Sequence, residues 1–138
     1  MKKSILFFGI LFLFTAFTSF AQDSTTIVLG PALSLDKMEH DYGTIDQHEN
    51  GDCVFLITNT GSEPLIISNC KGSCGCTVPS WPEKPIAPGE TAELKVHYNT
   101  AKVGPINKKV TVSSNAKNLT KGTVVVRIKG NIKPPFVK

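Results

Sequence analysis

The sequence has almost no helical pattern. Beyond the apolar segment at the N-terminus, no window places apolar residues at the i, i+3, i+4, i+7 spacing of an amphipathic helix. Instead, 9 prolines and 11 glycines punctuate the chain, and both residue types interrupt helices. A helical bundle is therefore excluded, and so is an α/β fold of alternating strands and helices.

The sequence also lacks a strong excess of either positive or negative charge. Lysine and arginine total 15 against 11 aspartate and glutamate residues, which gives a net charge of +4 at pH 7. Lys2 and Lys3 lie in a segment that we expect to be removed, and without them the excess falls from +4 to +2 (13 against 11). Nucleic acids and anionic membranes are bound by concentrated positive charge, so we expect neither as a partner.

Catalytic motifs are missing as well. The chain contains no G-x-S-x-G, H-E-x-x-H or phosphate-binding loop sequence. Its histidines, His40, His48 and His97, have no nucleophile or carboxylate at the spacing of a known motif. The sequence therefore predicts a protein that is not an enzyme and that requires no cofactor.

The N-terminus has the pattern of an export signal. Met1–Lys3 is positively charged, Ser4–Phe17 is apolar, and Ser19-Phe20-Ala21 places small residues at the −3 and −1 positions of a cleavage site. Cleavage would remove residues 1–21 and leave Gln22 as the first residue, with no membrane span. The alternative is an uncleaved anchor, but the polar, small residues before Gln22 favour cleavage. We expect a periplasmic, outer-envelope associated or secreted protein in an oxidising compartment.

The rest of the chain is a series of short β-forming runs. Ala92, Leu94, Val96 and Tyr98 alternate with polar residues, which predicts a strand with one buried face. Gly43 is expected to end the first run. The runs are Met38–Tyr42, Cys53–Thr58, Leu65–Ser68, Ala92–Tyr98, Ile106–Val112 and Val124–Lys129.

Short strands separated by turn residues indicate an all-β fold, an immunoglobulin-like antiparallel β-sandwich of about seven strands. The disulfide and tryptophan of a true immunoglobulin domain are not both available, because Trp81 lies in a proline-rich loop. We expect the domain at residues 36–133, between a linker or irregular N-terminal segment at 22–35 and a tail at 134–138. The side chains predicted to face the core are Phe55, Ile57, Leu65, Ile67, Leu94, Val96, Val110, Val112, Val124 and Val126.

Four cysteines offer structural disulfides as the first interpretation. Cys70, Cys74 and Cys76 lie close together in a loop, and Cys53 lies in the second strand. If Asn59 and Pro64 flank a simple hairpin, Cys53 and Cys70 lie opposite each other and could form a bridge. A sandwich usually places these two strands in different sheets, where alternation would turn Cys53 inward and Cys70 outward.

Two further interpretations of the cysteines involve chemistry. Cys74 and Cys76, separated by one glycine, could form a labile redox disulfide, because the ring would be small. Alternatively, Cys70, Cys74 and Cys76 could bind Zn²⁺ or Cu⁺ through thiolates, with His97 or His40 as a further ligand. The spacing matches no zinc-finger pattern, so bracing of the loop remains the leading interpretation.

Several motifs together resemble the DUF1573 family, a group of exported bacterial proteins common in Bacteroidetes and similar to Hydin/ASPM/SPD-2 immunoglobulin-like modules. The motifs are His40-Asp-Tyr-Gly-Thr-Ile45, Ile57-Thr-Asn-Thr-Gly61, Glu63-Pro-Leu-Ile66, Ser73-Cys-Gly-Cys-Thr77 and Ile86-Ala-Pro-Gly-Glu90. The resemblance extends over Lys37–Ile132. It implies an immunoglobulin-like sandwich outside the cytoplasm, and its pattern includes Cys74 and Cys76 but does not require cysteine at 53 or 70.

Two functions are compatible with these observations. The leading hypothesis is a non-enzymatic binding or scaffold module of the cell envelope, which contacts an unknown protein or envelope component through strand edges or the cysteine loop. The alternative is a thiol-redox or soft-metal-binding protein that uses the Cys70/Cys74/Cys76 loop.

Overall fold

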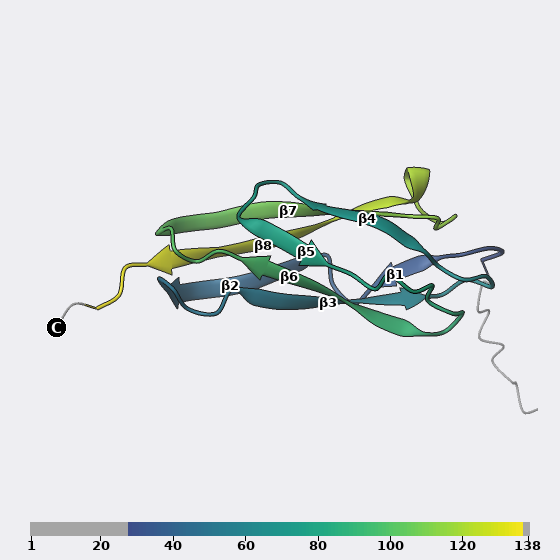
Figure 1. The fold of residues 1–138 in the computed structure, drawn as a ribbon, viewed down its shortest axis with the longest axis horizontal. Coiled ribbons are helices and arrows are strands. Elements are labelled where there is room, and N and C mark those ends of the chain that lie inside the picture. Colours follow the sequence, from purple (N-terminus) through teal and green to yellow (C-terminus); the bar gives the residue numbers. More distant parts are fainter. Residues whose placement is uncertain (1–27, 137–138) are drawn as a thin grey trace, which may run out of the picture.

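The computed structural model describes residues 28–136, which fold into two four-stranded sheets packed face to face (Figure 1). Sheet 1 has the order β1-β3-β6-β5, and sheet 2 has the order β2-β8-β7-β4. A single turn of 3-10 helix, η1 (Thr120–Gly122), precedes the last strand. The strands are β1 (Leu33–Leu35), β2 (Glu39–Asp46), β3 (Asp52–Asn59), β4 (Ile67–Gly72), β5 (Thr77–Ser80), β6 (Thr91–Tyr98), β7 (Gly104–Ser114) and β8 (Thr123–Lys133).

The predicted immunoglobulin-like β-sandwich is confirmed, with eight strands in place of about seven. One strand pair departs from the antiparallel expectation, because β2 runs parallel to β8. After β1 in sheet 1, the chain crosses to sheet 2, where β2 forms an edge strand beside β8. Within residues 28–136, no helix is both long and apolar enough to cross a bilayer.

The prediction that Gly43 ends the first run, which forms β2, is wrong. Gly43 has a φ of +64° and lies where the register shifts between Asp41 and Thr44, and β2 continues through this bulge to Asp46. Gly130 in the neighbouring β8 has a φ of +156°, and a Cβ there would lie 2.9 Å from the Tyr42 Cβ. Glycine thus permits the bulge and the close approach of the two strands.

The segment predicted as a linker is partly structured. Ala32 and Leu33 are buried, and β1 pairs with the end of β3, so the sheet begins before the expected boundary at 36. The strand has only three residues and follows Gly30-Pro31, which explains why no period was visible in the sequence. The signal peptide expected at 1–21, the first part of the linker and the last two residues of the tail lie outside the described residues.

The core lies between the two sheets, where the predicted face assignment is confirmed. Nine of the ten predicted residues are buried, and Val124 is half-buried against the same cluster. Leu65 reaches the core from a single β-bridge with Ile86, just before β4 begins. Other core members, all buried, are Cys53, Cys70, Tyr98, Ile106, Ile128 and Ile132.

A fully buried asparagine joins the loops at one end of the sandwich. The Asn59 Oδ1 accepts hydrogen bonds from the backbone nitrogens of Gly61 at 2.9 Å and Ala32 at 3.4 Å. Its Nδ2 donates to the carbonyl oxygens of Glu63 and Ile86, both at 2.8 Å. Because every polar atom of the side chain is satisfied, its burial is compatible with a stable fold.

Leu94 and Glu93 provide a matched test of the faces of β6. Leu94 is fully buried, and we expect Leu94→Ala to lower the free energy of unfolding by about 2 to 5 kcal/mol, as for other buried leucines. Glu93 is exposed, and Glu93→Ala should cost less than about 0.5 kcal/mol. Urea denaturation of both variants measures the difference, and equal losses would contradict the assignment.

Candidate functional site

The chain passes from sheet 2 to sheet 1 between β4 and β5, and the cysteine loop lies at this crossing. Cys74 and Cys76 are joined by a disulfide, with their Cα atoms 5.3 Å apart. Cys53 and Cys70 are buried free thiols. The predicted bridge between Cys53 and Cys70 is therefore wrong, because β3 and β4 belong to different sheets and do not form the hairpin that would bring them together.

The predicted outward orientation of Cys70 is also wrong. The register of β4 against β7 shifts between Ile67 and Asn69, so that Ser68 and Asn69 are both exposed. This bulge adds one residue to the outer row and returns Cys70 to the core, where it is 6% exposed. Simple alternation from Leu65 and Ile67 could not have revealed the extra residue.

The metal site predicted from Cys70, Cys74 and Cys76 is not assembled. The Cys70 thiol faces the core, whereas the other two sulfurs are joined to each other at the loop. In the part of the chain that the structure describes, no three His, Cys, Asp or Glu side chains are placed to share a metal. His97, the suggested further ligand, instead contacts Asp52 on the neighbouring strand, with Nδ1 2.6 Å from Oδ1.

Burial makes the two free thiols poor nucleophiles. It raises the pKa of Cys70 to about 12. Burial also raises the pKa of Cys53, against smaller lowering effects from a hydrogen bond with Tyr42 and the charge of Lys37. Since the thiolate is the reactive form, both residues act as small core side chains.

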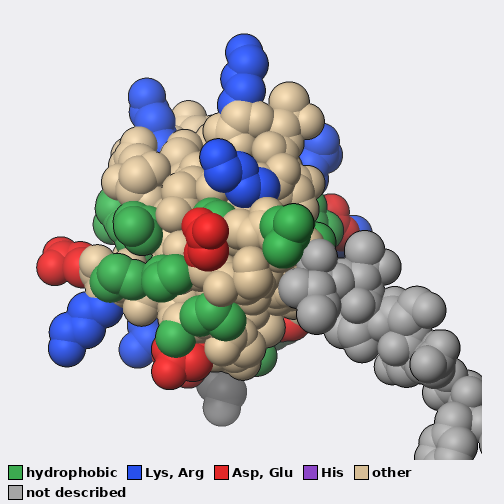
Figure 2. Space-filling view, turned by 90° about the vertical axis from the view of Figure 1, so that its right-hand side faces the viewer, with side chains coloured by type: hydrophobic (Ala, Val, Ile, Leu, Met, Phe, Trp, Pro, Cys, Tyr) green, Lys and Arg blue, Asp and Glu red, His purple; other side chains and the backbone are tan. Residues whose placement is uncertain are grey.

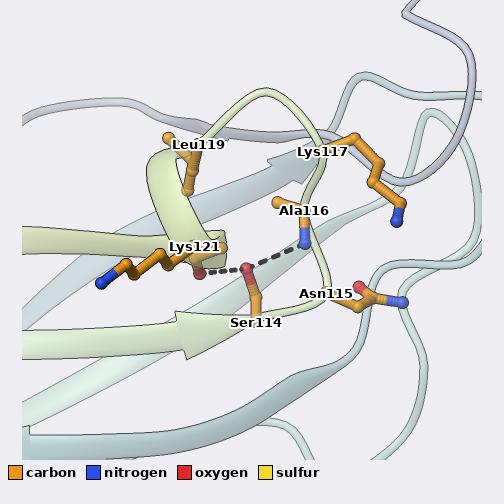
Figure 3. Close-up of a pocket in the computed structure, with 7 residues that line it drawn as sticks. Ser114, Asn115, Ala116, Lys117, Leu119 and Lys121 are labelled. Carbon is orange, nitrogen blue, oxygen red and sulfur yellow. Dashed lines mark hydrogen bonds between the residues drawn. The ribbon is translucent and has the colours of Figure 1, made fainter.

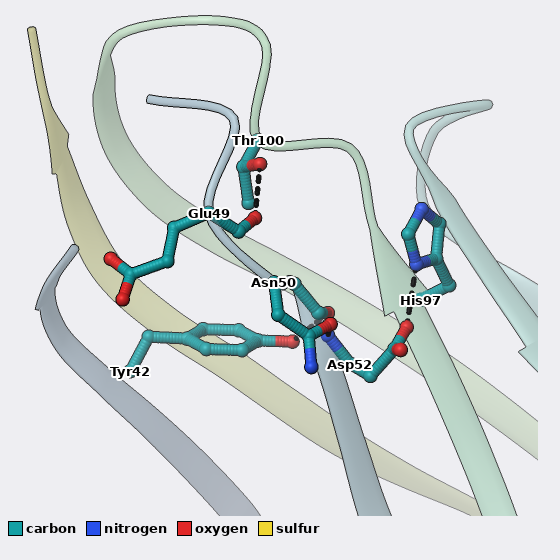
Figure 4. Close-up of polar contacts among 7 residues, drawn as sticks. Tyr42, Glu49, Asn50, Asp52, His97 and Thr100 are labelled. Carbon is teal, nitrogen blue, oxygen red and sulfur yellow. Dashed lines mark hydrogen bonds and ion pairs between the residues drawn. The ribbon is translucent and has the colours of Figure 1, made fainter. Parts of the chain in front are cut away.

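Polar contacts close the end of the sandwich where β2 and β3 meet (Figure 4). The Tyr42 hydroxyl donates to the carbonyl oxygen of Gly51 at 2.7 Å and so links β2 to sheet 1. Burial raises the pKa of this phenol above its ordinary value, which keeps it protonated as a donor. The Thr100 hydroxyl donates to the carbonyl oxygen of Glu49 at 2.6 Å. These contacts have a structural explanation.

The edges of sheet 1 are protected against strand addition. At β1, the Asn118 side chain accepts from the Leu33 nitrogen and donates to the Leu33 oxygen, both at 2.9 Å, and so occupies the place of a neighbouring strand. At β5, the Asn99 nitrogen donates to the Cys76 oxygen at 2.9 Å. Because bonded and non-bonded pairs alternate, the nitrogen of Pro79 then faces the open edge, where proline offers no donor.

The edges of sheet 2 are protected by bulges and charge. On β2, the Asp41 carboxylate accepts from the Gly43 nitrogen at 2.8 Å, and Lys129 lies 2.6 Å from Glu39. On β4, the bulge interrupts the ladder, and a Cβ at Gly72 would clash with the carbonyl oxygen of Thr77 across the crossing. Bulges, edge charges and covering segments are recognised ways of preventing strand addition.

The outer face of sheet 1 is more apolar than the alternating pattern of β6 suggested. Val78 is 56% exposed and Leu56 is 38% exposed, and half-buried Val54 lies with Val78 in a shallow hollow. The rest of the lining consists of Asp52, Cys53, Ser80, Lys95, Val96 and His97. We call the surface formed by Val54, Leu56, Val78, Lys95 and His97 the sheet 1 face. The sheet 1 face was not predicted from the sequence. The run Cys53–Thr58 is nevertheless mainly apolar without alternation, which indicates a strand with apolar side chains on both faces.

The end of the molecule at β1 and η1 shows no comparable surface (Figure 2). Its hydrophobic side chains lie in small separate groups among polar atoms and charges. A hollow at this end is formed by the loop from Ser114 to Gly122 (Figure 3). There the Ser114 hydroxyl donates to the Gly122 oxygen at 2.9 Å and accepts from the Ala116 nitrogen at 3.3 Å, so its polar groups serve the loop itself.

Thiol counting tests the placement of the cysteines. At pH 8 we expect the native oxidised protein to show no rapidly reactive thiol, because burial raises the pKa of both Cys53 and Cys70 and so favours the unreactive protonated form. Denaturant should expose two thiols, Cys53 and Cys70, and reduction in denaturant should give all four. A Cys53–Cys70 bridge would contradict this assignment. In denaturant alone it would give no free thiols if Cys74 and Cys76 are also bonded, or two free thiols at Cys74 and Cys76 if they are not.

Comparisons with solved structures show the same fold. A protein of unknown function from Porphyromonas gingivalis W83 superimposes with a TM-score of 0.65 at 15% identity, over 82% of this chain and 51% of that chain. The ASH/PapD-like domain 7 of human CEP192 gives 0.62 at 7% identity, over 75% and 87%. The CsuC-CsuE chaperone–tip adhesion subunit complex of Acinetobacter baumannii gives 0.54 at 13% identity, over 74% and 57%. This chain thus spans about half the length of the P. gingivalis protein.

The family assignment comes from the sequence. No curated protein matches the chain. The model of the family described as "Protein of unknown function (DUF1573)" matches residues 33–132, which begin at β1 and end near the end of β8. This match extends over almost the whole sandwich and confirms the resemblance carried by the turn and cysteine motifs. The chain belongs to the DUF1573 family.

Proposed function

We propose that this protein is a non-enzymatic binding module of the bacterial cell envelope, and that it contacts an exported partner protein through the sheet 1 face. The observation that carries the proposal is the hollow lined by Val54 and Val78, of which Val78 is 56% exposed. Lys95 and His97 come from β6, the strand between these two valines, and Asp52 and Ser80 add further polar groups to the lining. Apolar side chains combined with polar ones are common at protein-binding surfaces.

The protected edges favour a face over an edge as the contact surface. Strand addition needs a row of free backbone groups, and Asn118 and Pro79 limit that row on β1 and β5. On the face, by contrast, side chains are free to pack against a partner. We therefore favour contact through side chains over the strand-edge addition that the sequence also allowed.

The outer face of sheet 2 provides the internal contrast. Its exposed residues include Lys109 and Arg127 on paired strands, together with Val125, which is 40% exposed. Desolvating closely spaced cationic side chains costs free energy unless a partner supplies opposite charge. Sheet 1 has its apolar side chains grouped around one hollow and is the better candidate for a stable protein contact.

The envelope location is supported by the export signal predicted at residues 1–21 and by the location outside the cytoplasm that the family resemblance implies. Among the structural neighbours, CsuC-CsuE is a complex of a chaperone with a pilus tip adhesion subunit. That neighbour illustrates a related fold engaged with another protein. The partner of the present chain is expected to present an apolar side chain that fits the hollow at Val54 and Val78.

Site-specific photocrosslinking in the source organism tests the proposed surface. A photoreactive amino acid at Lys95, on the rim, should give a defined adduct with an envelope protein, whereas one at Lys109, on sheet 2, should give none. Val78→Glu should abolish the Lys95 adduct by placing a charge at the exposed apolar side of the hollow. Val125→Glu, a matched change on the opposite face, should preserve it.

Two results would contradict the proposal. One is an adduct from Lys109 and none from Lys95. The other is a Lys95 adduct that persists at full yield with Val78→Glu. Thermal melting of each variant shows whether it is folded, since both substituted valines are already exposed and their replacement should change stability by less than about 0.5 kcal/mol.

A further inference from the structure

The disulfide loop is open to solvent but lies on a rigid base. Gly75, between the two cysteines, is exposed, and a Cβ there would meet no atom within 4 Å. On either side the backbone is held, since the Thr77 nitrogen donates to the Cys74 oxygen at 3.2 Å and the Asn99 nitrogen donates to the Cys76 oxygen at 2.9 Å. Cys74 and Cys76 are half-buried, so the open side of the loop at Gly75 is where a reagent would approach.

A cationic hollow adjoins the disulfide on one side. Cys76 lines it together with Tyr98, Asn99, Ala101, Lys102 and Lys108. Lys108 is unusual because it lies on the inward side of β7, between the buried Ile106 and Val110. A lysine on a core-facing row is costly unless its ammonium reaches water or an anion. The hollow beside Cys76 provides such a place for the ammonium.

A hydroxyl group faces both sulfurs. The Thr77 Oγ1 lies 3.6 Å from the Cys74 Sγ and 3.9 Å from the Cys76 Sγ. Thr77 is only 3% exposed, so its hydroxyl has little access to bulk water. It is placed to donate a hydrogen bond to a sulfur that becomes a thiolate, and hydrogen bonds to charged acceptors are stronger than those to neutral ones.

We propose that Cys74 and Cys76 form a redox-active disulfide that accepts two electrons from a dithiol protein or peptide by thiol–disulfide exchange. This property belongs to a different surface from the sheet 1 face and does not depend on it. The bonded pair, the cationic hollow and the Thr77 hydroxyl carry the proposal together. A disulfide that only braces the loop would explain the bond. It would not explain why Lys108 lies beside Cys76 or why the loop is open to solvent at Gly75.

The exchange balances in two steps. A thiolate of the dithiol attacks the Cys74 Sγ, the Cys74–Cys76 bond breaks, and Cys76 leaves as a thiolate. The second thiolate of the dithiol then attacks the first sulfur of the dithiol, which is bonded to the Cys74 Sγ in the mixed disulfide. This attack closes the disulfide of the dithiol and releases Cys74 as a thiolate. Each thiolate released takes up one of the two protons that the dithiol lost. The dithiol becomes a disulfide, and Cys74 and Cys76 become two thiols.

The surroundings fix the direction of attack. Cys76 borders Lys102 and Lys108, whose positive charges stabilise a thiolate formed on its sulfur. A better-stabilised thiolate is a faster leaving group in the exchange. Cys74 therefore receives the attack, and Cys76 leaves. The ring between residues two positions apart is also small, so its opening changes the freedom of the unfolded chain little.

The first test is stoichiometric oxidation of a probe. The oxidised protein is mixed with a reduced synthetic peptide that contains two cysteines, and both products are alkylated and weighed by mass spectrometry. We expect one peptide disulfide for each protein molecule reduced, with the two alkyl groups on Cys74 and Cys76. The Cys74→Ser/Cys76→Ser double variant should oxidise no peptide while it retains the circular-dichroism spectrum and melting profile of the parent protein.

The second test concerns Lys108. Lys108→Gln should slow reduction of the disulfide by reduced glutathione about three- to ten-fold, because one of the charges that stabilise the leaving thiolate is removed. Lys109→Gln changes the next residue, which points to the opposite side of β7, and should leave the rate unchanged. Both variants also need to retain the melting profile of the parent protein.

Three results would overturn the proposal. A disulfide that resists glutathione and the dithiol peptide until denaturant is added would be a structural brace. Unfolding of the double cysteine variant would lead to the same conclusion. Equal rates for Lys108→Gln, Lys109→Gln and the parent protein would show that the cationic hollow does not assist the exchange.

Discussion

Two small sheets with four outer strands must satisfy the backbone groups along their edges, and this constraint organises the molecule. The chain changes sheets five times, and at two of these crossings, between β1 and β2 and between β4 and β5, it passes directly from an edge strand of one sheet to an edge strand of the other. Side chains complete the protection, with Asn118 alongside β1 and Pro79 within β5. Without these devices, the outer strands would be templates for association with other chains.

Crossings between the sheets also determine where chemistry and contact can occur. At the β2–β3 crossing, Tyr42 joins the two sheets through the carbonyl oxygen of Gly51 and packs against the core. At the β4–β5 crossing, close backbone approach requires Gly72 and leaves the disulfide loop projecting from the corner. The sheet 1 face and this corner are the two surfaces for which we propose contact with other molecules.

The sequence predicted the fold well where strands are long and regular. In β6, apolar and polar residues alternate without interruption, so Leu94 and Val96 were correctly assigned to the core. Alternation failed at bulges, because one extra residue reverses the faces that follow it, as at Cys70. The short strands β1 and β5 were missed because their pairing depends on partners distant in the sequence, not on a local pattern.

The candidate sites could be predicted only in part. The spacing of Cys74 and Cys76 suggested their pairing as one of three interpretations, whereas the hollow beside them needs Lys102 and Lys108 from another segment. Lys108 did interrupt an otherwise apolar row, which in retrospect is a local signal of an unusual environment. The sheet 1 face combines β3, β5 and β6, and the unpredicted β5 supplies its most exposed apolar residue, Val78.

Carbene footprinting of the unmodified protein, in intact cells and after purification, measures most directly whether the sheet 1 face is occupied. A partner on this face would lower the labelling of Val78 and Leu56 in cells relative to the purified protein. Val125, exposed on sheet 2, would be labelled equally in both samples. Equal labelling of Val78 in both samples, or protection confined to Val125, would contradict the account.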